Sequence, residues 1–202
     1  AGRGPLAKTT AWAGPDSPKG VSSLKLKIDP ETMKSTLTWR APTQGVHGGY
    51  VSGPAVTYNI VRYPGRKTVA SGYDKVKFEE TLEKDKLTSY FYTVTPVFEG
   101  MTGTPTTSNK VLVGDACEVP YEEYFNTEED FNLFTVIDAN KDGRTWEYHS
   151  ENGVVYCSFS SRQANDDWLI TPEIHMVPGR KYNFSFSGRR GMSDYAQQVS
   201  AS

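Results

Sequence analysis

A run of oxygen-bearing side chains at alternate positions is the clearest chemical signal in this sequence. Asp138, Asn140 and Asp142 precede Gly143, a spacing that gathers hard oxygen ligands around one divalent cation while the glycine permits a sharp turn. His149 stands where an EF-hand loop has its bidentate glutamate, and the flanking residues indicate strands instead of helices. The motif predicts a calcium loop in a β protein. The alternative is an ordinary turn, because Asp, Asn and Gly favour turns for backbone reasons alone.

A calcium site on this loop needs further carboxylates from neighbouring strands. Those available in the second half of the chain are Glu122, Glu123, Asp166 and Asp167. We expect Glu122 and Asp167 to complete the ligand set, because calcium takes six to eight oxygen ligands.

Two aromatic residues beside the loop are candidates for contact with a ligand. Trp146 and Tyr148 follow the loop, and exposed aromatic faces suit sugar rings or peptide side chains. An adjacent calcium ion would orient a polyol or stiffen a protein-binding loop. Trp168 alternates between Asp167 and Leu169, a pattern that predicts a core position for its ring.

The chain has two cysteines, Cys117 and Cys157, and no Cys-x-x-Cys pair that would make a zinc or redox site. One disulfide between them is the simplest interpretation, with a stabilisation of about 3 to 4 kcal/mol in the chain-entropy model. The alternative is two buried free thiols.

Motifs of known catalytic machinery are absent from the sequence: it contains no Gly-x-Ser-x-Gly elbow, His-Glu-x-x-His helix, phosphate loop or dinucleotide fingerprint. The remaining enzyme hypothesis is a thiol hydrolase that uses Cys157 as nucleophile, His149 as base and Asp166 as the orienting carboxylate. No spacing specifies that geometry, so we expect a chain without catalytic residues.

Composition limits the other classes of function. The 202 residues carry a formal net charge of −2, and the basic residues are scattered instead of clustered, which disfavours nucleic acid as a partner. The sequence has no apolar window of about 18 residues, so we expect no membrane span in this segment. Aromatic residues make up 12% of the chain and include 12 tyrosines, a content typical of strands.

Short alternating runs separated by Gly, Pro, Asp and Asn must position these side chains. In residues 21–114 the runs are 23–28, 36–39, 58–63, 75–78, 90–97 and 110–113. This rhythm predicts a β-sandwich of hairpins. Residues 1–20 predict one strand and a Pro-rich linker, which we interpret as the last strand of a preceding domain.

The segment 21–114 resembles a fibronectin type III domain. The matching residues are Trp39 in "Ser-Thr-Leu-Thr-Trp-Arg-Ala-Pro", Tyr58 at the start of the third run, the stretch 87–90 before "Tyr-Thr-Val-Thr-Pro-Val", and the closing run at 107–111. The resemblance implies a sandwich that serves as a spacer. Aromatic residues on alternating strands usually fill such a core, so we expect Trp39 and Tyr90 to be core residues.

The segment 115–202 resembles the cleaved-adhesin jelly rolls of Bacteroidota surface proteins, such as gingipain adhesins. The matching stretches are the opening at 121–125, "Ile-Asp-Ala-Asn-Lys-Asp-Gly" with the following Trp146, and "Asp-Asp-Trp-Leu-Ile-Thr-Pro-Glu-Ile". The resemblance implies a secreted or outer-membrane-associated surface protein, an oxidising compartment that favours the disulfide, and calcium as the metal. A jelly roll has about eight strands, so we expect this second domain to be incomplete, with a last strand at 195–202.

The predicted fold class is therefore all-β, a fibronectin type III-like β-sandwich at 21–114 followed by an incomplete jelly-roll β-sandwich at 115–202. The predicted function is non-catalytic adhesion or ligand binding outside the cell, with a glycan or a host or surface protein as partner. The alternative is an accessory, non-catalytic region of a larger secreted peptidase or glycoside hydrolase. A surface stalk that contacts only its neighbours is a third possibility.

Overall fold

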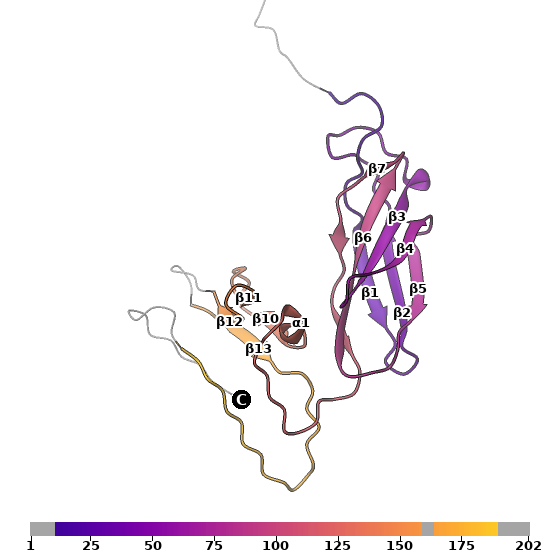
Figure 1. Cartoon of the computed structure of the whole chain (residues 1–202). Helices are drawn as coiled ribbons and strands as arrows, with labels where there is room; N and C mark the ends of the chain where they lie inside the picture. The colour runs from indigo at the N-terminus through magenta and orange to yellow at the C-terminus, as the bar shows by residue number, and fades with distance from the viewer. Residues whose placement is uncertain (1–10, 159–163, 190–202) are drawn as a thin grey trace, which may run out of the picture.

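The protein is nearly all β in a computed structural model that describes residues 11–158 and 164–189 (Figure 1). The predicted all-β fold is confirmed. The strands of the first part are β1 (Ser22–Ile28), β2 (Lys34–Arg40), β3 (Thr57–Tyr63), β4 (Lys67–Tyr73), β5 (Lys77–Thr81), β6 (Thr88–Phe98), β7 (Met101–Thr102), β8 (Thr106–Thr107) and β9 (Val111–Val113), with the 3-10 turn η1 at Gly53–Ala55. The second part has α1 (Glu128–Phe131), β10 (Thr135–Asp138), β11 (Trp146–His149), β12 (Val154–Cys157) and β13 (Asp167–Ile170).

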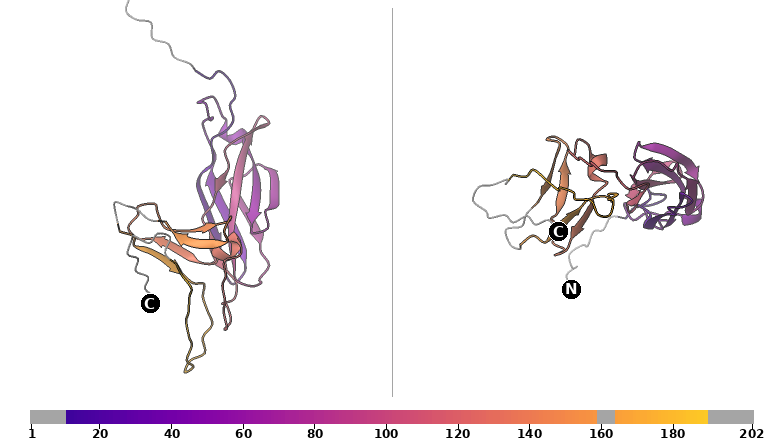
Figure 2. Two further views of the ribbon diagram at one scale, coloured as in Figure 1. Left: turned by 60° about the vertical axis from the view of Figure 1, so that its left-hand side comes forward. Right: turned by 90° about the horizontal axis from the view of Figure 1, so that it is seen from below.

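The first nine strands form two sheets of a sandwich. One sheet has the order β1-β2-β5, and the other has the order β4-β3-β6, with β7, β8 and β9 all paired to β6. The named strand pairs are antiparallel, and both sheets run along the long axis of the first part (Figures 1 and 2). This two-sheet arrangement agrees with the sandwich that the sequence pattern predicts.

The core lies between these sheets because alternate residues of each strand point inward. Leu26, Leu37 and Trp39 come from the first sheet, and they pack with residues such as Ile60 and Tyr92 from the second. The two sheets therefore meet in one continuous apolar layer, which is what stabilises a sandwich of this size.

Two details of the first part differ from the sequence prediction. Tyr90 is only half-buried, while Tyr92 is fully buried, so Tyr92 is the aromatic residue that occupies the core. Tyr90 and Tyr92 share one face of β6, but Tyr90 lies near the start of the strand, where it packs against the core and stays partly exposed. The prediction also missed β4, whose pattern Lys-Thr-Val-Ala-Ser-Gly-Tyr is small and polar; Gly65 and Arg66, both at positive φ, make the tight turn that folds it back on β3. Trp39 is 5% exposed, as a core residue should be.

Strands β10 to β13 lie beside the sandwich and do not join its sheets (Figures 1 and 2). β10 pairs with β13 and β11 pairs with β12, both antiparallel. Residues 128–131 form the short helix α1, where strands and turns were predicted. Thr127 caps this helix in a capping box with Asp130, and local hydrogen bonds of this kind favour a helix start over an extended chain.

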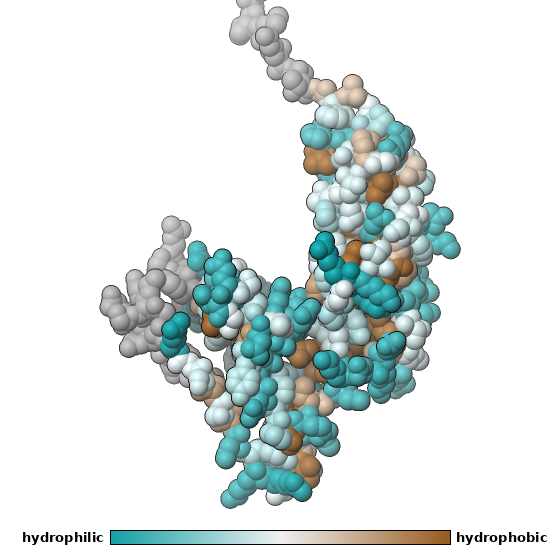
Figure 3. Space-filling model, viewed as in Figure 1, coloured by the Kyte–Doolittle hydropathy of each residue, from teal (hydrophilic) through white to brown (hydrophobic). Residues whose placement is uncertain are grey.

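The second part has a thinner core than the first. Val113 is the last of the buried hydrophobic residues in the described part of the chain. Beyond it, the described apolar side chains other than Pro172 are half-buried or exposed, and Figure 3 shows hydrophobic residues at the surface of both parts. Trp168 is 50% exposed and lies opposite Ile137, itself 42% exposed, so the prediction of a core position for Trp168 is wrong.

No helix in the described residues is long and apolar enough to cross a membrane. The strands predicted within residues 4–10 and 195–202 lie outside the part that the structure describes. Of the first segment, residues 11–20 form two isolated bridges, Pro15 to Tyr50 and Pro18 to Gly45, and no extended strand.

Candidate calcium loop

The predicted loop connects β10 to β11 and begins opposite the start of β13. Asp138, the last residue of β10, pairs in register with Asp167, the first residue of β13. The amide of Ala139 donates to the carbonyl of Asp166 at 2.9 Å. The sheet pairing therefore brings two carboxylate residues that are far apart in sequence to one corner of the module.

Side-chain oxygens organise the backbone of the loop. Asp138 accepts from the amide of Asp142 at 3.2 Å through Oδ1 and from the amide of Gly143 at 2.9 Å through Oδ2. Asn140 Oδ1 also accepts from Asp142, at 3.3 Å, and Asp142 Oδ1 accepts from the amide of Arg144 at 2.8 Å. Gly143 has φ +77°, a conformation that favours glycine. The turn interpretation and the calcium interpretation share this geometry.

Two carboxylate oxygens of this corner are buried without a hydrogen-bond donor. They are Oδ2 of Asp142 and Oδ1 of Asp167. Burying an acceptor without a partner costs about 1 to 3 kcal/mol, and more for a charged group. Across residues 11–158 and 164–189, no three His, Cys, Asp or Glu side chains converge into a formed metal site.

Glu122 makes its hydrogen bond within its own segment. Its Oε2 accepts a hydrogen bond from the hydroxyl of Tyr124 at 3.0 Å, and both residues are exposed. The neighbouring Glu123 accepts from the amide of Phe125. Both acidic residues accept hydrogen bonds within the segment 121–125, and the role of Glu122 in the loop stays a prediction, whereas Asp167 lies beside the loop.

Cys157 lies at the same corner, at the end of β12. Its thiol is 3.6 Å from Oδ2 of Asp167, and Nδ2 of Asn165 donates to its sulfur at 3.3 Å. Burial, joined by the nearby carboxylates of Asp167 and Asp142 and opposed by the hydrogen bond from Asn165, raises the pKa of the Cys157 thiol to about 11. A thiol in this setting is a poor nucleophile at neutral pH.

The predicted disulfide is not formed, and both cysteines are free thiols. Cys117 lies in a different place, where its amide donates to the carbonyl of Glu173 and its carbonyl accepts from His175. Each cysteine is therefore held by different neighbours, and spacing in the sequence carries no information about that separation.

The thiol-hydrolase arrangement is not assembled either. Cys157 pairs with Trp146, and His149 pairs with Val154. Residues 146 and 149 point to opposite faces because side chains alternate along a strand, so Cys157 and His149 also lie on opposite faces. The ring of His149 instead contacts Tyr156, with centroids 6.0 Å apart.

The predicted ligand-contact residues use their polar atoms inside the protein. Nε1 of Trp146 donates to the carbonyl of Asp167 at 3.2 Å, and the hydroxyl of Tyr148 donates to the carbonyl of Asn126 at 2.9 Å. Both side chains are half-buried, and Tyr148 stacks on Phe131. Their positions beside the loop are as predicted, while their role in ligand binding stays a prediction.

A second cluster of polar and aromatic side chains, which the sequence did not lead us to predict, lies at one end of the sandwich. The carboxylate of Asp16 is buried and contacts the ring of His47, which stacks on Trp12 with centroids 4.5 Å apart. Gly45 and Gly49 make room for Asp16, since a Cβ at either position would lie within 2.7 Å of its side chain. The "Gly-Val-His-Gly-Gly" stretch was the signal that such a close approach exists.

Comparisons with known proteins find fibronectin-like folds and no family. No family model and no curated protein matches the sequence. A Fn3-like protein from Clostridium thermocellum is 19% identical with a TM-score of 0.34, over 48% of this chain and 93% of that one. Domains d3-d4 of the rat CD45 extracellular region are 15% identical with a TM-score of 0.34, over 48% of this chain and 49% of that one. The FN1-FN3 domains of chicken CNTN1 are 13% identical with a TM-score of 0.33, over 79% of this chain and 59% of that one.

Proposed function

We propose that this chain is a non-catalytic binding region of a secreted or surface protein, with the sandwich as spacer and the second part as an adhesin-like jelly-roll module. In this proposal a calcium ion organises the β10–β11 loop, and the loop presents a surface for a glycan or protein ligand. The observation that carries it is the pair of buried carboxylate oxygens without donors, on Asp142 and Asp167.

A bound calcium ion would stabilise the unpaired carboxylate oxygens of this corner. A carboxylate oxygen buried without a donor is unfavourable, and two carboxylates near each other repel. A cation would supply the missing partner for both oxygens, while backbone amides already hold the carboxylates of the loop in place. The residues that would hold the ion are Asp138, Asn140, Asp142 and Asp167, all with the oxygen ligands that calcium prefers.

The ion would also connect the loop to the ligand surface. Trp146 begins β11 directly after the loop and is tied to the main chain of Asp167. A rigid loop would fix the ring of Trp146 and the adjacent Tyr148 for contact with a ligand, which lowers the entropy that binding must otherwise offset.

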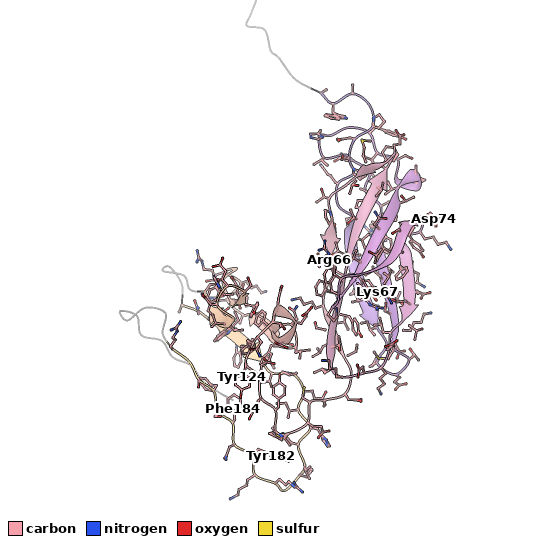
Figure 4. All side chains as sticks on the ribbon, viewed as in Figure 1. Arg66, Lys67, Asp74, Tyr124, Tyr182 and Phe184 are labelled. Carbon is pink, nitrogen blue, oxygen red and sulfur yellow. The ribbon has the colours of Figure 1, made fainter. Side chains whose placement is uncertain are left out.

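Thermal unfolding of the whole chain tests the calcium site. We expect calcium to raise the transition temperature relative to EDTA, because a ligand at 100 times its Kd stabilises by about 2.7 kcal/mol, or several degrees for a small domain. The double variant Asp138→Ala/Asp142→Ala should lose the response. The exposed Asp74, on the sandwich, provides the matched control Asp74→Ala, which should keep it (Figure 4).

Ligand binding is tested separately, on glycan and peptide arrays with calcium and with EDTA. Binding that needs calcium and falls in Trp146→Ala supports the proposed function. An unchanged transition temperature in calcium would show that the loop is an ordinary turn without a metal. Array binding that depends on neither calcium nor Trp146 would show that the ligand surface lies elsewhere.

A further inference from the structure

One sheet of the sandwich presents a basic outer face. Strands β1, β2 and β5 form this sheet, and alternate residues of each strand point away from the core (Figure 1). The outward positions hold charged residues and small hydroxyl side chains. The basic residues among them are all exposed: Lys25, Lys27, Lys34, Arg40 and Lys77. The acid among them is Glu79, so this face is positive in a chain whose formal net charge is −2.

The register of the sheet gathers cations that are scattered along the sequence. Thr38 of β2 lies between Lys25 of β1 and Lys77 of β5. Strand spacing therefore separates the main chains of Lys25 and Lys77 by about 10 Å. Lys27 follows Lys25 on the same face at about 7 Å, and Arg40 lies two residues beyond Thr38. These positions form a row of cations across the sheet.

The acid on this face neutralises only part of its charge. Oε1 of Glu79 lies 3.2 Å from Nζ of Lys34 and 2.9 Å from Nζ of Lys77, so two cations share one carboxylate. The other basic residues of the face form no ion pair with any residue of 11–158 or 164–189: Lys25, Lys27 and Arg40. A row of unpaired like charges repels itself and attracts an anion laid along it.

The outer face of the other sheet differs. The outward residues of its strands β3 and β6 are uncharged: Thr57, Asn59, Val61 and Tyr63 on β3, and Phe91, Thr93, Thr95 and Val97 on β6. The positive charge is therefore concentrated on one side of the sandwich. A spacer needs no such difference between its two faces.

We propose that the outer face of β1-β2-β5 binds a linear polysaccharide that carries sulfate or carboxylate groups. Such a polymer repeats its anions along a line, as the cations repeat along this face, and its hydroxyl groups can bond to the exposed Thr38 between them. The outward positions of these strands hold no aromatic ring for a base to stack on and no apolar side chain to enter a lipid layer. Both facts favour an acidic glycan over nucleic acid or a membrane.

Binding of the whole chain to dextran sulfate in EDTA tests the proposal, with neutral dextran as the uncharged probe. We expect biolayer interferometry to detect dextran sulfate alone. Its Kd should rise about 10-fold between about 50 and 200 mM salt, because each neutralised anion releases a counterion. Polygalacturonate, which carries only carboxylates, shows whether sulfate is needed; binding to it assigns both anions as ligands, and its failure beside dextran sulfate assigns sulfate.

Two triple variants locate the binding surface. Lys25→Gln/Lys27→Gln/Arg40→Gln should weaken binding to dextran sulfate by about 10-fold or more, as expected from the loss of three charge contacts. The matched control removes the same charge from exposed positions outside this sheet and should bind like the wild type: Lys67→Gln/Lys141→Gln/Lys181→Gln. Equal urea midpoints would show that both variants fold.

The failure of this inference can be told apart from the failure of the calcium site. Asp138→Ala/Asp142→Ala should bind dextran sulfate like the wild type, because the basic face does not depend on the loop. No binding at about 50 mM salt, or equal losses in the two triple variants, would overturn the proposal. So would binding to duplex DNA, or to vesicles of phosphatidylglycerol and phosphatidylcholine, as tight as that to dextran sulfate.

Discussion

Nδ1 of His47 lies 2.9 Å from Oδ1 of Asp16, a carboxylate that is 1% exposed. The same carboxylate accepts from the amides of His47 at 2.7 Å and Gly49 at 3.1 Å. Main-chain bonds continue this contact, from Val46 to Ser17 and from Lys19 to Gln44. One buried side chain therefore fastens the segment before β1 to the loop after β2.

Acid should weaken the contact between Asp16 and the loop after β2. Burial by itself raises the pKa of Asp16, but the hydrogen bonds from His47 and from the amides of Gly49 and His47 outweigh it and lower the pKa. A carboxyl whose folded pKa is lower than its unfolded value, about 3.9, contributes stability above that pH and loses it as the pH falls through the folded pKa. We expect the urea midpoint of the wild type to fall below pH about 4.

The variant Asp16→Asn isolates that contribution, because the amide keeps the size and loses the charge. It should be less stable than the wild type at neutral pH, and the difference should shrink below pH about 4. A constant difference between the two proteins across this pH range would contradict the role assigned to Asp16.

Removal of the buried hydroxyl of Tyr92 should destabilise the sandwich, because this group is hydrogen-bonded in the core. The hydroxyl of Tyr92 donates to Oε1 of Glu80 at 2.7 Å and lies 3.0 Å from Oγ of Ser35, and Glu80 also binds Arg62 at 2.7 Å. Burial raises the pKa of Tyr92, so the phenol stays protonated and remains a donor.

We expect Tyr92→Phe to lower the free energy of unfolding by about 1 to 2 kcal/mol, because Ser35 and Glu80 lose a buried partner. Chemical denaturation measures this difference. The control Tyr50→Phe removes a hydroxyl from a side chain that is 64% exposed and should change stability by less than about 0.5 kcal/mol. Equal effects of the two substitutions would show that the buried hydrogen bonds add nothing.

Neutralising one acid of the β10–β11 loop should have opposite effects with and without calcium. Asp142→Asn removes a charge near Asp167 and Asp138 and keeps an oxygen to accept from Arg144. In EDTA we expect the variant to be as stable as the wild type or more so, since like charges no longer repel. In calcium the wild type should gain stability and the variant should not. A loss of stability in EDTA as large as that in calcium would assign Asp142 a purely structural role.

Cys157 should react slowly with alkylating reagents. With a thiol pKa of about 11, the thiolate fraction at pH about 8 is on the order of 100-fold smaller than for an ordinary cysteine. Mass spectrometry after iodoacetamide treatment, in a Cys117→Ser background, measures the rate. Asp167→Asn should speed the reaction because it removes a neighbouring negative charge. Alkylation as rapid as that of an exposed cysteine with an ordinary pKa would contradict the raised pKa of Cys157.

Local pattern was enough for most strands of the sandwich, with β4 as the exception, and for the shape of the loop. Tyr92 and Val94 alternate with polar threonines, and this alternation predicts a strand with one apolar face and one polar face. Asp138, Asn140 and Asp142 bond to amides within five residues, so the turn they make follows from sequence neighbours alone. These hydrogen bonds join residues only a few positions apart, so the residue types within the loop are enough to predict them.

Contacts between distant residues were decided only by the tertiary structure. Asp16 meets His47 across 31 residues, and the Gly-Val-His-Gly-Gly stretch indicates a close approach without saying which distant residue makes it. Trp168 alternates like a core residue and yet lies half in solvent, because period two separates the faces of a strand without stating which face another layer covers. The sequence determined which residues share a face; the packing of the sheets decided which faces are buried, since burial depends on a partner surface that is remote in the chain.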